Sequence, residues 1–176
     1  MGHEHITLRL ALPADARQIA LMSRDHIEAG LGWSWNPQRV EKALCHPDTS
    51  TLVACDRGRS GERIVAFAIM LFGDEHAHLN LLAVLPTHRR LGLGRRMMEW
   101  LVESAYAAGM VVIHLELRAS NQGARRFYRT LGFDESAYIP GYYSGREMAL
   151  RMLRELRRPG IASVQWQLPA PPSDKT

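Results

Sequence analysis

The sequence predicts a single α/β domain built on a central mixed sheet, and three observations lead to this prediction. Strand-like and helix-like patterns follow one another in the order β-α-α-β-β-β-α-β-α-β-β, with an alternating β-α-β-α centre. The run Arg63–Phe72 is almost wholly apolar, as expected of a strand that is covered on both faces. The length of 176 residues, with 46% hydrophobic and 23% charged residues, fits one globular domain with a real core.

The first predicted elements are a short strand and two helices. Residues 5–11 alternate between apolar and polar side chains, which indicates a strand. Pro13 stands in the first turn of a helix that Gly30 ends. Its buried face is expected to carry Ala16, Ile19, Ala20, Ser23 and Ile27. Asn36 can cap a second helix with Pro37 at its first position, and Val40 and Leu44 would face inward.

Three strands and the strongest helix follow. The strands are predicted at residues 50–56, 63–72 and 77–85, with a turn rich in glycine and polar residues before the second and another turn before the third. Pro86 ends the third strand. Residues 92–109 have the clearest helical spacing of apolar side chains, and Gly109 fits the C′ position.

A strand over residues 110–118, a helix over 119–132 and two strands over 133–143 and 146–153 complete the expected domain, which spans residues 1–156. The chain changes character from Arg157 on. Residues 157–176 hold four of the nine prolines, so we expect a Pro-rich C-terminal tail, in which "ASVQWQL" would form one extra edge strand if it folds.

Arginine and glycine gather in "THRRLGLGRRMM", Thr87–Met98, between a predicted strand and the strongest predicted helix. The free N–H groups and the positive dipole end of a helix N-terminus bind anions. Gly92 and Gly94 would let a phosphate approach the backbone closely, and the arginines would add charge-assisted hydrogen bonds. The stretch therefore predicts a pyrophosphate cradle; the alternative is a tight turn with solvated arginines.

Several other classes of function do not fit. Met97 occupies the third glycine position of a dinucleotide fingerprint, and no Walker A string is present. The basic cluster lacks the aromatic-rich face expected of a nucleic-acid surface. No apolar run reaches a membrane span of about 18–20 residues, and no signal-peptide core is apparent. Cys45 and Cys55 lack a metal-binding spacing. We therefore expect a cytoplasmic protein with free thiols and no metal, nucleic-acid or membrane partner, in which His76 and His78 face solvent.

"RRLGLG", Arg89–Gly94, resembles the R/Q-x-x-G-x-G/A motif of the GCN5-related N-acetyltransferase (GNAT) family. With "LNLLAVLPTHRRLGLGRRMMEWL" and "LELRASNQGARRFYRTLGF", the chain is similar to the RimI-like ribosomal-protein-alanine branch, closely over about residues 79–133 and more loosely over 6–72. The resemblance implies a GNAT-like fold: a twisted, mostly antiparallel sheet with helices on both faces and two splayed parallel strands at its centre. It also implies acetyl-CoA as the co-substrate, with its pyrophosphate in the cradle.

The resemblance further implies which residues hold acetyl-CoA. The exposed backbone of Leu82, Ala83 and Val84 would bind the pantetheine arm as an added strand does. Asn121 would contact the same arm in addition to its ordinary role as a helix N-cap. The pyrophosphate would lie on Arg89, Arg90, Leu91, Gly92, Leu93, Gly94 and Arg95.

The resemblance makes Glu116 the general base and Tyr128 the general acid. An amine must lose a proton before it attacks the thioester, and the departing thiolate must gain one. From the residues alone, Glu116 has a simpler reading as a solvated side chain paired with Arg118, and Tyr128 as a core residue of its helix. A backbone N–H, assigned to Val84, would stabilise the oxyanion.

The acceptor is less well defined. The predicted activity is acetyl transfer to a primary amine by direct attack, with a protein N-terminal α-amine as the first choice of acceptor. Ile139–Gly141 replaces the basic run that RimI-like proteins carry before the paired tyrosines Tyr142 and Tyr143. The alternatives are a small amine (a polyamine, amino acid or aminoglycoside) or a non-catalytic acyl-CoA-binding module. Trp33 and Trp35 either line the acceptor pocket or simply pack their loop, and the protein would be a monomer or homodimer.

Overall fold

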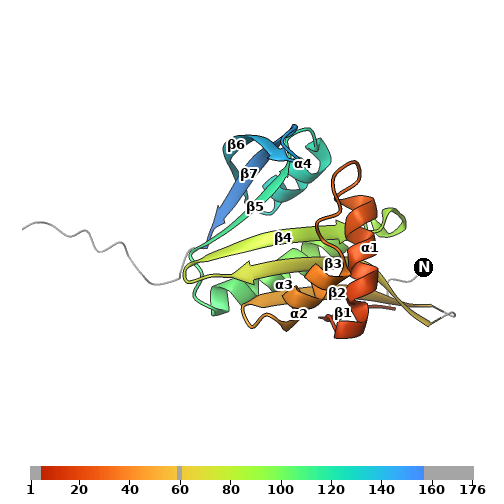
Figure 1. Cartoon of the computed structure of the whole chain (residues 1–176). Coiled ribbons are helices and arrows are strands. Elements are labelled where there is room, and N and C mark those ends of the chain that lie inside the picture. The colour runs from red at the N-terminus through yellow and green to blue at the C-terminus, as the bar shows by residue number, and fades with distance from the viewer. Residues whose placement is uncertain (1–4, 59–60, 157–176) are drawn as a thin grey trace, which may run out of the picture.

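The computed structural model describes residues 5–58 and 61–156, and the prediction for the tail at 157–176 lies outside them (Figure 1). The elements follow the predicted order. They are β1 (Ile6–Leu10), α1 (Ala16–His26), α2 (Pro37–Cys45), β2 (Thr49–Gly58), β3 (Gly61–Phe72), β4 (His76–Val84), α3 (Leu93–Ala107), β5 (Val112–Arg118), α4 (Gln122–Thr130), β6 (Asp134–Tyr143) and β7 (Glu147–Glu155). Two short 3-10 turns, η1 (Pro13–Asp15) and η2 (Pro86–His88), precede α1 and α3.

The strands form one sheet in the order β1-β2-β3-β4-β5-β7-β6. Every neighbouring pair is antiparallel except β4 and β5, which are parallel. In Figure 1, α1 and α2 cover one face of β2–β4 and α3 covers the other. The middle of β3 is consequently buried without a break from Ile64 to Met70. The mixed, mostly antiparallel sheet with helices on both faces is confirmed.

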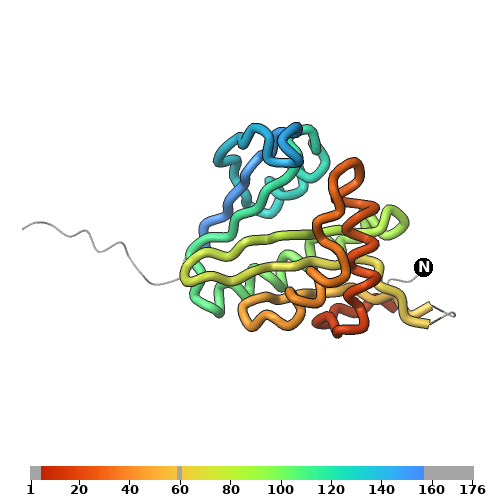
Figure 2. Tube along the Cα trace, viewed as in Figure 1, coloured from red at the N-terminus to blue at the C-terminus, as the bar shows by residue number. Residues whose placement is uncertain are grey.

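The two central parallel strands pair over only four residues each, as the resemblance implied. His76–Leu79 of β4 pair with Val112–Leu115 of β5, and the pairing ends there. Figure 2 shows the two strands diverging beyond this point, so that β5, β6 and β7 form a wing apart from β1–β4. On the other side of β4, Met70 of β3 pairs with Leu79 and Ile69 pairs with Leu81, so Asn80 is a one-residue bulge.

Capping residues fix the starts of α2 and α4. The Asn36 Oδ1 accepts a hydrogen bond from the Arg39 N–H at 3.0 Å, and the Asn121 Oδ1 accepts one from the Ala124 N–H at 3.0 Å. The end of α1 differs from the prediction, because the helix stops at His26 rather than at Gly30. The Ser23 carbonyl there accepts from the N–H groups of both Ile27 and Glu28, which closes the last turn early.

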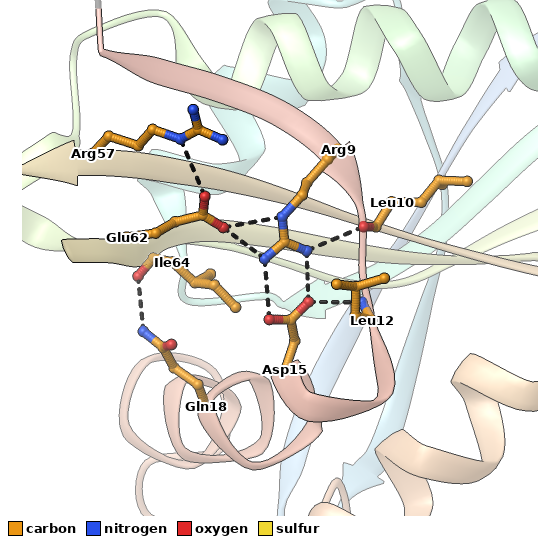
Figure 3. A network of polar contacts seen from close by, with 8 residues as sticks. All are labelled: Arg9, Leu10, Leu12, Asp15, Gln18, Arg57, Glu62 and Ile64. Atoms are coloured by element: carbon orange, nitrogen blue, oxygen red, sulfur yellow. Dashed lines mark hydrogen bonds and ion pairs between the residues drawn. The ribbon is translucent and has the colours of Figure 1, made fainter.

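A network of ion pairs around the partly exposed side chain of Arg9 joins β1 to the start of α1 (Figure 3). The Arg9 guanidinium donates to both carboxylate oxygens of Asp15, at 2.7 and 3.2 Å, and to Glu62 of β3 at 2.9 Å. Asp15 also accepts from the Leu12 N–H at 2.7 Å. Although burial alone would raise the pKa of Asp15, the bonds from Arg9 and Leu12 lower it below its usual 3.8. One side chain thus joins three segments of the N-terminal half.

Among the helices within residues 5–58 and 61–156, none is long and apolar enough to cross a membrane.

We predict that Arg9→Met destabilises the fold without touching the site described below. Removing the guanidinium leaves Asp15, whose side chain is 13% exposed, without its cation, and we expect a loss of about 1–2 kcal/mol. Thermal unfolding should then shift down by roughly 2–8 °C. Because the folded pKa of Asp15 is lowered, this difference should persist at neutral pH and shrink as the pH falls below 3.8. Arg57→Met is the control, since Arg57 is 69% exposed and makes one contact, to Glu62 at 3.3 Å; an equal shift for both variants would refute the prediction.

Candidate functional site: an anion cradle beside a split sheet

The first turn of α3 offers free backbone donors. Gly92 is its N-cap with φ +76°, a left-handed conformation that suits glycine, and it has no side chain with which to cap the helix. The first bond along the helix runs from the Arg96 N–H to the Gly92 carbonyl at 3.0 Å. The N–H groups of Leu93, Gly94 and Arg95 precede that bond and have no partner within the helix. They form the positive end of the helix dipole, as the predicted cradle requires.

Gly94 serves a different purpose from Gly92. A Cβ at Gly94 would lie only 3.1 Å from the Phe127 ring of α4 and 3.8 Å from the Val84 side chain. The glycine therefore lets the start of α3, the end of β4 and α4 meet closely. At Gly92 a Cβ would meet nothing within 4 Å, so backbone conformation is the constraint there.

The arginines of the cradle are exposed and two of them also bind neighbouring elements. The Arg89 Nε donates to the Val84 carbonyl at 3.1 Å, and the Arg95 Nη2 donates to the Thr130 hydroxyl at 3.2 Å. The side chains of Arg89, Arg90, Arg95 and Arg96 all reach solvent. The cradle is consequently a cationic surface anchored on both β4 and α4.

The end of β4 presents backbone groups to the split. The Leu85 N–H donates to the Val65 carbonyl of β3 at 2.8 Å. Because backbone groups alternate in direction along a strand, the N–H of Ala83 also points toward β3, and those of Leu82 and Val84 point away from it. Of the three residues predicted to bind the pantetheine arm, Leu82 and Val84 therefore offer their backbone to the split, and Ala83 contributes a buried side chain.

Glu116 lies on β5 just beyond the last residue that pairs with β4, and its side chain is 4% exposed. Its Oε2 is 2.7 Å from His78 Nε2, and its Oε1 accepts from Arg151 Nε at 2.7 Å. Burial alone would raise the pKa of Glu116, but the bonds from His78 and Arg151 prevail and lower it to about 2. The alternative of a solvated Glu116 paired with Arg118 is wrong, because Arg118 pairs with Glu147 at 3.1 Å.

The histidines differ from the sequence expectation. His76 is exposed as expected, but the His78 side chain is only 28% exposed and its ring stacks on that of His114, with centroids 4.4 Å apart. Burial and the charge of His78 lower the pKa of His114. No sequence pattern assigned a role in the site to His114 or Arg151. The alternation of His114 and Glu116 on one strand face was visible, but the parallel pairing that sets His78 opposite His114 was not.

Tyr128 lies on α4, facing inward, and is 7% exposed. Its ring meets those of Phe127 and Phe133 edge-on, with centroids 5.1 and 5.6 Å apart. Burial, with a smaller contribution from Tyr143, raises the pKa of Tyr128 well above its usual range. The alternative prediction, that Tyr128 is a core residue of its helix, is therefore confirmed. Burial at this position also keeps the phenol protonated.

Arg118, at the end of β5, joins both wings of the sheet. Its Nη2 donates to the Ala29 carbonyl beyond α1 at 2.6 Å, and its Nη1 donates to Glu147 of β7. Its guanidinium also lies over the Tyr143 ring, 5.9 Å from the centroid. Arg118 thereby connects the α1–α2 loop to the start of β7.

The α1–α2 loop is organised by the buried carboxylate of Glu28. This carboxylate accepts from the Ser23 hydroxyl, the Ser34 N–H and the Trp35 N–H at 2.8–3.1 Å. The Trp33 indole N–H donates to the Ala20 carbonyl, and Arg39 covers the Trp35 ring at 4.3 Å. These contacts support loop packing as the role of the two tryptophans. Tyr142 lies nearer the site: burial and the Glu116 charge raise its pKa.

Comparison with known proteins agrees with this geometry. Residues 19–133 match the acetyltransferase (GNAT) family. Over 94 residues the chain is 39% identical to the [ribosomal protein bS18]-alanine N-acetyltransferase of Salmonella typhimurium, covering 52% of this chain and 64% of that protein. The chain thus spans slightly less than two thirds of that relative.

Two solved structures share the fold. The ribosomal-protein-S18-alanine N-acetyltransferase from Escherichia coli superposes with a TM-score of 0.71 at 28% identity, covering 89% of this chain and 97% of that one. Arabidopsis thaliana NAA60 in complex with acetyl-CoA gives a TM-score of 0.76 at 16% identity, covering 86% and 98%, a likeness of fold alone. The family model matches most of the chain, and the split sheet and the glycine cradle agree with that match. The chain therefore belongs to the GNAT acetyltransferase family.

Proposed function

We propose that this protein transfers the acetyl group of acetyl-CoA to a primary amine, with a protein N-terminal α-amine as acceptor. The observation that carries the proposal is the split between β4 and β5, with an uncapped, arginine-lined helix N-terminus at one end and Glu116 within it. The family match and the similarity to N-terminal acetyltransferases support it.

The residues of the cradle fit acetyl-CoA. The free N–H groups of Leu93, Gly94 and Arg95, together with the exposed arginines Arg89 and Arg90, suit a pyrophosphate. The backbone of Leu82 and Val84 suits the amides of an extended pantetheine arm, and we assign Leu91, Gly92 and Asn121 to the same ligand. When bound, this co-substrate supplies the activated acetyl thioester.

We assign proton removal to Glu116 acting together with His78. A free α-amine titrates near 7.7–8.0, so moving its proton to a carboxylate with a pKa of about 2 costs on the order of 8 kcal/mol. Glu116 alone is therefore too weak a base to hold the proton of the amine. An ionised carboxylate only accepts hydrogen bonds, so His78 Nε2 carries the shared hydrogen, and a neutral His78 ring keeps a lone pair on Nδ1. Glu116 fixes this form of the ring and stabilises its protonated state.

We assign the acid role to Tyr128 and stabilisation of the developing negative charge to the Val84 N–H. The buried phenol stays protonated throughout the working pH range, so it is available as a donor to the departing sulfur. The Val84 N–H points away from β3, toward the split. Tyr128 lies on α4 and Val84 ends β4.

A protein N-terminus suits the acceptor side better than a polyamine or an aminoglycoside. Such small polycations are bound by free carboxylates. The carboxylates of this region already have partners. Glu28 accepts hydrogen bonds from its own loop, Glu116 is bonded to His78 and Arg151, and Glu147 pairs with Arg118. We also propose a cytoplasmic location, which two free thiols, Cys45 and Cys55, support.

The experiment that tests the function measures CoA thiol release against a panel of acceptors. The panel contains peptides with free and with blocked α-amines, lysine peptides, spermidine and an aminoglycoside. We expect turnover only with free α-amines. Turnover with the small amines alone would replace the proposed acceptor class, and acetyl-CoA binding without turnover on any member would point to a binding module.

We predict that Tyr128→Phe lowers kcat about 10²-fold and leaves acetyl-CoA affinity within twofold, because only the proton donor is lost. The ring and its packing against Phe127 and Phe133 remain. Steady-state kinetics and calorimetric binding of acetyl-CoA check the two parts. Tyr106→Phe, on an exposed position of α3, is the matched control. A normal kcat for Tyr128→Phe would remove the acid assignment.

We predict that Glu116→Gln lowers kcat by about 10²-fold or more, because His78 loses the charge that stabilises its protonated form. Since Glu116 is already ionised far below neutral pH, the natural protein should show no kinetic titration of this carboxylate between pH 5 and 9. pH–rate profiles of both proteins provide the measurement. Glu103→Gln, on the exposed side of α3, controls for loss of a carboxylate. An unchanged kcat for Glu116→Gln would contradict the assignment.

A further inference from the structure

His78, His114 and Glu116 form a compact group of metal-ligating side chains within the split. One donor atom from each lies within 4.8 Å of the other two. His114 and Glu116 are two residues apart on β5 and so share a face, and the strand register sets His78 of β4 directly opposite His114. Three donors on two hydrogen-bonded strands are held by the backbone itself rather than by loops.

The chemistry of this group suits a borderline divalent cation. Two imidazoles and one carboxylate are a set that binds Zn²⁺ with a coordination position left open. Arg151 holds Glu116 Oε1 and leaves Oε2 for the ion, as a neighbour of a ligating carboxylate does in metal sites.

The geometry requires a modest adjustment. Two ligands on one tetrahedral Zn²⁺ lie roughly 3.3 Å apart, from bond lengths of about 2.0–2.2 Å. His78 Nε2 and Glu116 Oε2 are already 2.7 Å apart, around a shared proton. The ion would replace that proton, which moves to Nδ1 of the same ring, so that the group releases no net proton. The His114 ring would turn out of its stack on His78 to bring its donor atom, within 4.8 Å of the other two, to the ion.

We propose that His78, His114 and Glu116 bind one Zn²⁺-class divalent cation, and that the bound ion inhibits acetyl transfer. Inhibition, which rests on the proposed function, follows because the ring proton then occupies Nδ1 of His78, the atom assigned to accept the proton of the amine, and the ion takes Oε2 of Glu116. Metal binding itself does not depend on the activity.

The binding test uses the full chain, stripped with a chelator and free of acetyl-CoA. Co²⁺ is titrated as a spectroscopic substitute for Zn²⁺ and followed by its visible absorption. We expect one ion per chain, with no sulfur-to-metal band from Cys45. His114→Asn should weaken binding at least tenfold, and His76→Asn, on an exposed position of the same strand as His78, should change it less than twofold. Thermal unfolding verifies that both variants fold. Binding that His114→Asn leaves intact, or no binding at micromolar metal, would overturn the proposal.

The inhibition test measures turnover with and without Zn²⁺ and then with added chelator. We expect at least a tenfold, reversible loss that is much smaller in His114→Asn, each variant being compared with its own metal-free rate. If the ion binds through His114 and turnover is unaffected, the inhibitory part of the proposal and the base assignment of Glu116 and His78 both fail. If no acceptor is turned over at all, the absorption titration still decides whether the site exists.

Discussion

The end of hydrogen bonding between β4 and β5 is the constraint on which the rest of this structure depends. Beyond Leu79 and Leu115 the two strands no longer satisfy each other's backbone groups. Unpaired N–H and C=O groups are costly when buried, so an extended ligand that replaces the missing strand is favoured there. The chain then leaves β4 and enters α3, whose N-terminus supplies further free N–H donors nearby. The split and the cradle are therefore two ends of one binding surface.

The split also removes the backbone hydrogen bonds that would join β1–β4 to β5–β7 beyond Leu79 and Leu115, so other contacts must join these two parts of the sheet. Arg118 compensates by bonding the Ala29 carbonyl on one side and Glu147 on the other. Glu28 gives the loop that carries Ala29 a fixed shape. Arg151 performs a comparable task within the wing, where it neutralises Glu116 in a place with little access to water. The polar groups of this region thus hold one another in place before any ligand arrives.

Much of the fold could be read from the sequence, because local signals determine it. Apolar spacing located all the helices and strands of the described residues, and Asn36 and Asn121 cap helices as their residue type indicated. The end of α1 was missed because the Ser23 carbonyl accepts from two successive N–H groups, a local turn that the spacing of apolar residues does not show. The family resemblance supplied the splayed strands and the cradle residues. It could not supply the partners of Glu116, since His78 and Arg151 come from strands whose register no local pattern reveals. The position of Trp33 depends on a contact between its loop and α1, which was equally out of reach.

The bulge at Asn80 makes part of this chain intolerant of changes in length. The bulge takes up one residue of β4, and from Leu81 to Val84 the ladder with β3 is regular, so the direction of each backbone group there depends on its count from the bulge. Loss of Asn80 itself would leave a regular ladder, whereas loss of Leu82 or Ala83 would set Val84 opposite Phe67 and turn its N–H group toward β3. Related sequences should therefore align without gaps from Leu81 through Gly94.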